Sequence, residues 1–431
     1  MSILLHLFIF TKTWLGALSL SEFPFRDFKD AAVEAQLTTT LTGYLDAAFV
    51  LFSAAYLYPR RESLLELPCR RLWTLFLILL LIAAVFIAPS PLLALRRFVK
   101  VLVFLSIYAV MFVRAREADS NTLTSLKWIL RSAWIPVLYG IGDFLAHAEL
   151  SWTAISNRDY REYSTFMHAN PFAYFCVIVL LVAVILWRYR PEIPVQRKTF
   201  LVVLSALVLI ALVTTGTRGA ILGAFIAFLL AIRSSWKLKI ATASLAVIAL
   251  FQVPTFANPV KAVGALALGN QDSLADAMLQ TAEEIHEDDL EHTSELASRL
   301  LIWKTMIDGV GEHYLLGHGM NSAATFYEAE SGLFLNPHND YILLTFETGL
   351  CGLVLYWWIL LGVGIVLIKR RKALLPSSLP GLLSDAGLFL IFFLAVISFT
   401  DNLFVDDYNT PLIWSILGAA SGTVLRRTAQ V

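Results

Sequence analysis

The sequence predicts an all-α integral membrane protein, and three observations support this fold class. Hydrophobic residues make up 58% of the 431 residues and charged residues only 15%, whereas the apolar share of a soluble domain is about half. Mostly apolar runs recur along the whole chain, near the length of about 20 residues that crosses a bilayer. Lys and Arg gather in alternate connections between these runs, as they do in cytoplasmic loops.

Twelve apolar runs are predicted to span the membrane. They lie near Ser2–Leu20, Leu41–Tyr58, Leu72–Ile87, Phe98–Val113, Trp128–Phe144, Phe172–Trp187, Phe200–Thr215, Ala220–Ile232, Ile240–Phe256, Gly349–Ile368, Leu382–Thr400 and Leu412–Leu425. Residues 1–256 therefore hold spans one to nine and residues 338–431 hold spans ten to twelve. Between them, residues 257–337 form one long loop that we expect to be partly helical.

Basic residues give the twelve spans a direction. They follow every even-numbered span, as Arg60, Arg61, Arg70, Arg71; Arg114, Arg116, Lys127; Arg188, Arg190, Arg197, Lys198; Arg233, Lys237, Lys239; Lys369, Arg370, Arg371, Lys372; and Arg426, Arg427. Because short cytoplasmic loops are rich in Lys and Arg, both termini are predicted to be cytoplasmic, and the long loop to face the periplasm of a bacterial inner membrane. Arg96 and Arg97, before span four, go against this pattern.

Several classes of protein are disfavoured. The formal net charge is zero, so no basic field indicates nucleic acid. The three cysteines are scattered and form no CxxC pair. ATP is absent outside the cytoplasm, and the chain has neither a GxxxxGK[ST] nor a GxGxxG motif in a strand-then-helix context. No cofactor is therefore predicted.

Arg218 lies in a short outer turn between spans seven and eight. Gly216 and Gly219 let a ligand approach the backbone there, and Thr217 is a suitable N-cap for the next helix. The free N–H groups and positive end of that helix, beside a guanidinium, would form an anion site that suits phosphate. The alternative is an arginine that reaches for lipid headgroups.

Arg299 is unusual in the long loop, which is rich in acids and has Lys261 and Lys304 as its other basic residues. We predict a helix over Ser294–Asp308. Its apolar face, toward membrane or core, would be Leu296, Leu300, Trp303 and Ile307. Arg299 is a candidate for phosphate binding, the alternative being an ordinary ion pair with Glu295 four residues earlier.

His338 opens the tenth spanning region. Asn336 is a suitable cap and Pro337 suits the first helical position, so His338 is expected in the first turn. The positive helix end disfavours imidazolium, and a neutral ring is able to act as a general base. The alternative is a histidine that only makes structural hydrogen bonds. His318 is too far away in sequence to indicate zinc, and no metal site is predicted.

Two other outer loops contribute weaker candidates. Arg161, ahead of span six, is a candidate for the same anion site. Asp406 and Asp407 form an acidic pair in another outer loop, for which a solvated acidic turn is the interpretation we favour.

These residues resemble the O-antigen ligase family and its wider superfamily, which includes O-antigen polymerases and protein O-oligosaccharyltransferases. One similar stretch is the Thr-Gly-Thr-Arg-Gly turn at Thr215–Gly219. The other is a pattern of His, Asn, nine residues, Gly, two residues and Gly, matched by His338, Asn339, Gly349 and Gly352. The segment with Ser298, Arg299 and Trp303, followed by Gly317-His318-Gly319, is similar to the superfamily's loop. The resemblance covers about Thr214–Gly352.

The resemblance implies a GT-C-type glycosyltransferase of twelve helices. Such an enzyme moves O-antigen from undecaprenyl pyrophosphate to a sugar of lipid A-core, with inversion and without metal or ATP. The family's catalytic histidine corresponds to His338 and its two essential arginines to Arg218 and Arg299. We add six candidates for substrate binding: Arg161, Gly216, Thr217, Gly219, Asn339 and Tyr341.

Other functions remain open at this point. A polymerase or a protein O-oligosaccharyltransferase shares the same histidine and arginines, but the chain has one major outer loop and ends soon after span twelve. A transporter or flippase is the alternative from another class. Carriers place ionisable residues near the bilayer midplane, whereas the candidates here lie at the ends of apolar runs.

Overall fold

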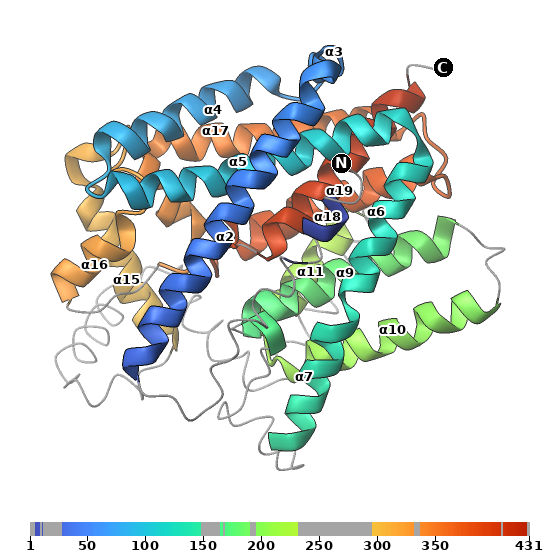
Figure 1. The fold of residues 1–431 in the computed structure, drawn as a ribbon, viewed down its shortest axis with the longest axis horizontal. Helices are drawn as coiled ribbons and strands as arrows, with labels where there is room; N and C mark the ends of the chain where they lie inside the picture. The colour runs from blue at the N-terminus through green and yellow to red at the C-terminus, as the bar shows by residue number, and fades with distance from the viewer. Residues whose placement is uncertain are drawn as a thin grey trace, which may run out of the picture.

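A computed structural model of the chain describes residues 5–8, 11, 28–147, 164–166, 169–189, 195–231, 295–331, 337–406 and 408–428. Throughout these ranges the regular elements are helices and no strand occurs (Figure 1), which confirms the all-α prediction. The longer helices are α2 (Phe28–Leu57), α4 (Arg70–Ile82), α5 (Pro91–Glu117), α6 (Asp119–Ser132), α7 (Trp134–His147), α9 (Ala169–Tyr189), α10 (Val195–Thr214), α11 (Arg218–Ala231), α15 (Glu295–Val310), α16 (Ala323–Ser331), α17 (Asp340–Arg371), α18 (Leu379–Ile397) and α19 (Asn409–Thr428).

Five helical segments in the described residues are long and apolar enough to cross a membrane: Arg70–Ile87, Pro91–Glu117, Ala169–Tyr189, Asp340–Arg371 and Leu379–Ile397. Two shorter apolar helices cover Lys198–Thr214 and Gly219–Ala231. Each coincides with a predicted span. Most of the first predicted span and all of the ninth lie outside the described residues, as does most of the long loop before α15.

Helix α19 lies at the centre of the bundle, and this position accounts for its modest hydropathy. Every residue from Asn409 to Val424 is buried, and α19 packs mainly on α5 and α18. A Cβ atom on Gly418 would lie 2.4 Å from the Tyr108 carbonyl oxygen, and one on Gly422 would lie 2.2 Å from that of Phe112. Small residues let two membrane helices approach this closely. A helix enclosed by protein does not need the apolar surface that lipid would require.

Helix α17 is broken at Gly349, where φ is 67° and ψ is −177°. The segment 313–319 fits into the break, so that a Cβ atom on Gly349 would lie 2.1 Å from the carbonyl oxygen of Leu315. Four backbone hydrogen bonds join the two segments: His318 N to Phe346 O (2.8 Å), Gly319 N to Glu347 O (3.0 Å), Leu350 N to Tyr314 O (2.8 Å) and Cys351 N to Leu315 O (3.3 Å). Irregular backbone is tolerated beside a membrane helix when protein satisfies it in this way.

The Gly317-His318-Gly319 motif therefore has a structural part in this break. The His318 ring stacks on Phe346 with ring centroids 4.4 Å apart, and its Nε2 lies 2.7 Å from the carbonyl oxygen of Gly309. A Cβ atom on Gly317 would lie 2.5 Å from the backbone of Glu347. Both glycines have positive φ angles, 72° and 92°, which glycine adopts without strain.

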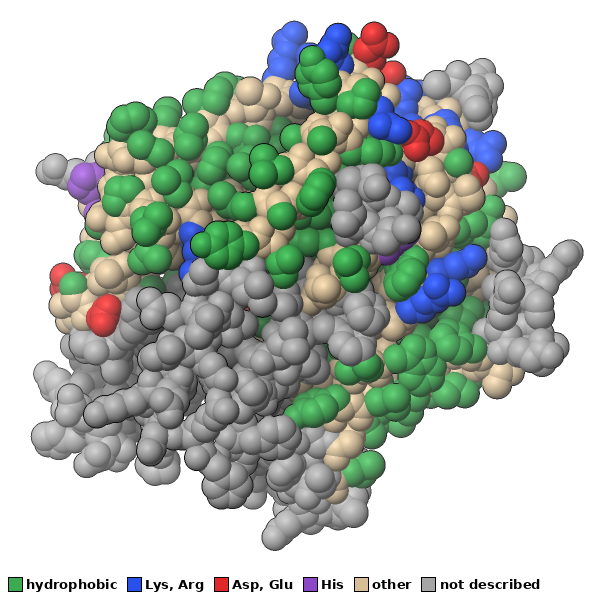
Figure 2. Space-filling model, in the orientation of Figure 1, with side chains coloured by type: hydrophobic (Ala, Val, Ile, Leu, Met, Phe, Trp, Pro, Cys, Tyr) green, Lys and Arg blue, Asp and Glu red, His purple; other side chains and the backbone are tan. Residues whose placement is uncertain are grey.

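The long helices share a basic end, which we define by Arg60, Arg116, Lys369, Arg370, Arg371, Arg426 and Arg427. It includes the C-terminal ends of α5, α17 and α19. In Figure 2 most blue Lys and Arg side chains lie along the upper right, near α3 (Arg61–Leu64) and the C-terminus. Arg97, which goes against the charge pattern, forms an ion pair with the buried Glu347. Its charge is compensated inside the protein.

Candidate functional site

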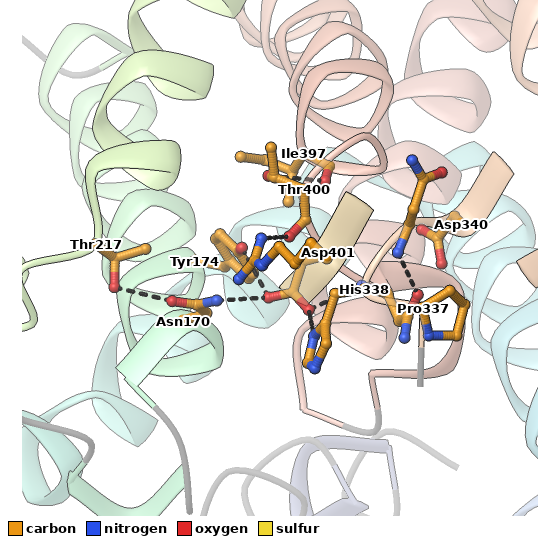
Figure 3. Close-up of polar contacts among 12 residues, drawn as sticks. Asn170, Tyr174, Thr217, Pro337, His338, Asp340, Ile397, Thr400 and Asp401 are labelled. Atoms are coloured by element: carbon orange, nitrogen blue, oxygen red, sulfur yellow. Dashed lines mark hydrogen bonds and ion pairs between the residues drawn. The ribbon is translucent and has the colours of Figure 1, made fainter. Parts of the chain in front are cut away.

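The carboxylate of Asp401 is the centre of a polar cluster at the other end of the bundle, just after α18. It accepts hydrogen bonds from Asn170 Nδ2 (3.0 Å) and the Tyr174 hydroxyl (2.9 Å), both on α9. It also accepts from the backbone N–H of Asn402 (2.9 Å). On its other side, Asp401 Oδ1 lies 3.1 Å from Nδ1 of His338 (Figure 3). The histidine is thereby fixed against a carboxylate that three further donors hold in place.

The electrostatics of this pair determine which ring nitrogen is available. Burial is the largest influence on the pKa of Asp401 and by itself raises it. The hydrogen bond and electrostatic interaction with His338, together with the N–H groups of Asn402 and Asn170, outweigh burial and lower the pKa to about 2. An ionised carboxylate only accepts hydrogen bonds, so Nδ1 of His338 carries the hydrogen. Nε2 is then the nitrogen that accepts a proton from elsewhere.

His338 lies before the helix and not inside its first turn, which corrects the position expected from Pro337. The residue has a left-handed φ of 46°, and α17 begins only at Asp340. The cap is Asn339, whose side-chain oxygen accepts from the N–H groups of Tyr341 (3.0 Å) and Ile342 (3.2 Å). Asparagine satisfies the first free N–H groups of a helix in this way. Outside the helix, the imidazole is 38% exposed and accessible to a substrate.

Two candidates for substrate binding have their polar atoms engaged within the protein. Asn339 also donates to the carbonyl of Phe399 (3.3 Å), and its backbone N–H donates to Asn402 Oδ1 (2.8 Å). The Tyr341 hydroxyl donates to the carbonyl of Ala395 (3.0 Å), and its ring stacks on Trp357. Both side chains attach the start of α17 to the end of α18, and so shape the backbone around His338.

Helix α15 brings Arg299 to the same cluster. One guanidinium nitrogen of Arg299 donates to the carbonyl of Thr400 at 2.6 Å, one residue from Asp401. One turn further along α15, Trp303 Nε1 donates to the carbonyl of Pro337 at 2.6 Å, one residue from His338. Helix α15 therefore contacts both backbone segments that carry the acid and the histidine.

The Thr215–Gly219 turn also meets this cluster. Gly216 has a φ of 61°, and the buried Thr217 hydroxyl donates to Asn170 Oδ1 at 3.3 Å. A Cβ atom on Gly219 would lie 3.5 Å from the Thr400 hydroxyl oxygen, so the start of α11 lies beside the carbonyl that Arg299 contacts. Arg218 is the first residue of α11. Its side chain and all of Arg161 lie outside what the structure describes.

Sequence reasoning missed Asp401, Asn170 and Tyr174. Each stands at the outer end of an apolar run, where a polar residue is common and therefore uninformative. Asn170 precedes Pro171 at the start of a span and Asp401 follows a long apolar run. These positions place both residues on the predicted outer side of the membrane. That location was the one signal in the sequence that could have identified them.

Asp406 has a structural role at the start of α19. Its carboxylate accepts from the backbone N–H groups of Tyr408 (2.8 Å) and Asn409 (3.1 Å) and from Asn409 Nδ2 (2.7 Å). Burial raises its pKa to about 6, although the hydrogen bonds from Asn409 and Tyr408 oppose this. Asp407 lies outside the described residues. Among those described, no three His, Cys, Asp or Glu side chains are grouped as metal ligands.

Residues 200–357 match the family model described as O-antigen ligase. This segment is an O-antigen ligase family domain. The family implies a glycosyltransferase-type enzyme. The O-antigen ligase domain contains the α10–α11 turn, α15 and the start of α17, and therefore Arg218, Arg299 and His338. Asn170, Tyr174 and Asp401 lie beyond its two ends. No curated protein matches the chain.

Proposed function

We propose that the protein is an O-antigen ligase. It transfers O-antigen polysaccharide from undecaprenyl pyrophosphate to a sugar hydroxyl of lipid A-core, on the periplasmic face of the bacterial inner membrane. The observation that carries the proposal is the His338–Asp401 pair beside Arg299, at the edge of an O-antigen ligase domain. The pair provides a general base, and the arginine provides positive charge for a pyrophosphate.

In the proposed reaction, Nε2 of His338 accepts the proton of the acceptor hydroxyl as its oxygen attacks C1 of the first O-antigen sugar. The bond between C1 and the phosphate oxygen breaks, and undecaprenyl pyrophosphate leaves with the electron pair. Attack opposite the leaving group inverts C1. Asp401 stabilises the imidazolium, because its carboxylate is ionised and in hydrogen-bond contact with Nδ1.

The arginines act on the leaving group in this proposal. Positive charge placed where negative charge develops lowers the barrier most effectively when it is already in position. Arg299 is held at Thr400, and Arg218 starts the helix that meets Thr400 through Gly219. Guanidinium groups bind phosphate oxygens in pairs. The proposed reaction needs neither a metal nor ATP.

The membrane orientation is part of the proposal. The basic end defined above would face the cytoplasm together with both termini. The His338–Asp401 pair lies at the opposite end of α17 and α18, and in this proposal that end faces the periplasm. A lipid-linked donor and a lipid-linked acceptor meet at that surface.

Deletion of the gene tests the proposal against its nearest alternatives. We expect full-length O-antigen to accumulate on its lipid carrier while lipid A-core stays uncapped, as measured by glycolipid extraction and gel analysis. Accumulation of single unpolymerised repeats would instead indicate a polymerase. Loss of glycan from a protein, with normal lipopolysaccharide, would indicate a protein O-oligosaccharyltransferase. Accumulation of the donor on the cytoplasmic side would indicate a flippase.

Replacing Arg299 by alanine is expected to lower the transfer rate about 10²-fold, the scale for removing one preorganised charge from a transition state. The assay uses purified protein, extracted donor and lipid A-core in excess chelator, where the wild-type protein is expected to remain active. Lys304→Ala is the matched control, since Lys304 is exposed on the same helix. Equal rates for Arg299→Ala and wild type would contradict the role given to Arg299.

A further inference from the structure

The basic end of the bundle holds a cavity of about 800 Å³, far from the His338–Asp401 pair. It lies where α17 ends, α18 begins and α19 ends, with the start of α6 and the end of α9 as further walls. Three cations line it, Lys369, Arg370 and Arg427, against one carboxylate, Asp119. The rest of the lining is mainly apolar or small.

The carboxylate in this cavity is already neutralised. Asp119 Oδ2 accepts from Arg427 at 2.8 Å, and its other oxygen pairs with Arg426. Arg371, which follows the cavity residue Arg370 in the chain, is also paired: its Nε lies 2.7 Å from Asp385 Oδ1. These pairs leave the cavity with a surplus of positive charge. An anion bound in the cavity would balance this surplus.

Lys369 and Arg370 are the cations that supply this surplus. Both are exposed at the last turn of α17, and among the described residues neither has an ion pair with an acid. Other cations at the basic end do have one, as Arg60 has with Glu117 (3.0 Å) and Arg116 with Glu66 (2.6 Å). Two cations without such partners, both lining one cavity, are what a phosphate group requires.

The backbone adds to the positive potential of the cavity. Helix α18 begins there, with Ser378 as its N-cap and Leu379 and Pro380 as its first residues. The positive end of the helix dipole therefore points toward the cavity. This contribution is secondary, since the Ser378 side chain already accepts from the N–H of Gly381 at 3.2 Å.

An apolar track leads along α17 to the same place. Leu361, Ile365 and Ile368 follow one another at helical spacing and are 57%, 40% and 48% exposed. Beyond the helix end, Leu375 lines the cavity and is 72% exposed. Large exposed apolar side chains on a membrane helix face acyl chains, so the track provides a place for the tails of a lipid whose headgroup lies in the cavity.

We propose that this cavity binds the phosphate headgroup of an anionic phospholipid from the cytoplasmic leaflet. Basic pockets between membrane helices on the cytoplasmic side suit such headgroups. The site requires that the basic end face the cytoplasm, but it is independent of the transferase activity. A free phosphate ion would bind through the same positive charges, but it has no acyl chains to contact the apolar track. The track therefore favours the lipid.

Lipid retention by the purified full-length protein, measured by native mass spectrometry with phosphatidylglycerol and phosphatidylcholine, tests the proposal. Removing two charges near a membrane surface, in Lys369→Ala/Arg370→Ala, is expected to weaken phosphatidylglycerol retention about thirtyfold and to leave phosphatidylcholine unchanged. Arg70→Ala/Arg71→Ala is the matched control, because these exposed arginines also lie at the cytoplasmic side of the predicted topology but outside the cavity. Lys369→Arg/Arg370→Lys keeps both charges and is expected to retain the lipid.

Three results would overturn the proposal. Equal phosphatidylglycerol retention by the wild type and the double alanine variant would exclude the cavity. An equal loss in the Arg70→Ala/Arg71→Ala control would show a diffuse surface effect instead of a site. Displacement of phosphatidylglycerol by excess inorganic phosphate, with no preference over phosphatidylcholine, would assign the cavity to a soluble phosphate compound.

Discussion

His338→Ala is expected to lower the transfer of O-antigen to lipid A-core by about 10⁴-fold, the upper end of the range for a general base. The reason is geometric as well as chemical. His338 alone among the described histidines contacts Asp401, and its ring is exposed enough to reach a substrate hydroxyl. Membrane insertion should be unchanged, because the ring lies outside the helices. The measurement is a transfer assay with equal amounts of each purified variant.

His313→Ala is the matched control for this prediction. His313 is an exposed histidine at the end of the short helix Gly311–His313, which follows α15. Its replacement tests whether loss of any outer histidine lowers the transfer rate. We expect a rate within about twofold of wild type. Normal capping by His338→Ala in cells would contradict the general-base role.

Asp401→Asn is expected to lower the rate about 10³-fold without preventing folding. The side chain keeps its shape and several hydrogen bonds, but it loses the negative charge that stabilises the imidazolium, and exchange of a carboxylate for an amide costs about 10⁴ in a comparable histidine–aspartate pair. Michaelis constants for the donor should change little. Asp385→Asn is the control, because it removes a carboxylate from an ion pair with Arg371 at the basic end.

The pH dependence gives a second check on Asp401. Since its folded-state pKa is lowered to about 2, the stability that it contributes is full above about pH 4 and is lost as the pH falls toward 2. No titration of Asp401 should therefore appear in the wild-type rate between pH 5 and 8. A rate that followed ionisation of Asp401 in that window would show that the carboxylate is not held as described.

Much of the fold follows from apolar periodicity. Helix α15 covers Glu295–Val310, close to the predicted Ser294–Asp308. Its buried side chains, however, include Ile302 and Met306, while Ile307 is 58% exposed. The apolar pattern identified the helix, and its predicted face was to point toward membrane or core. The pattern could not say which side protein encloses, because Ile302 and Met306 are also apolar and the partner helices determine that side.

The break in α17 illustrates another limit. The predicted span begins at Gly349, where the structure has not a helix start but an interruption inside Asp340–Arg371. Hydropathy detects the apolar run after Gly349. It does not detect the shorter helix before it, whose last carbonyls accept hydrogen bonds from His318 and Gly319. Those partners are distant in the chain and leave no periodic signal.

The candidate site was predicted in part. His338 and Arg299 were identified by residue type and position, and the structure brings both to Asp401 and Thr400. The carboxylate itself and its α9 partners were not found. Asp401 is 63 residues from His338, 231 from Asn170 and 227 from Tyr174. Spacing arguments work within one helix or turn, whereas this cluster exists only after four helices pack together.

The segment inserted at Gly349 sets a boundary for exchanging parts between related proteins. The N–H groups of His318 and Gly319 bind carbonyls before the break, and carbonyls of Tyr314 and Leu315 bind N–H groups after it. A chimaera that replaced the outer loop but kept the native α17 would leave these backbone groups without partners, two of them on the buried Phe346 and Glu347. Residues from Gly309 to Gly352 therefore have to be transferred as one unit.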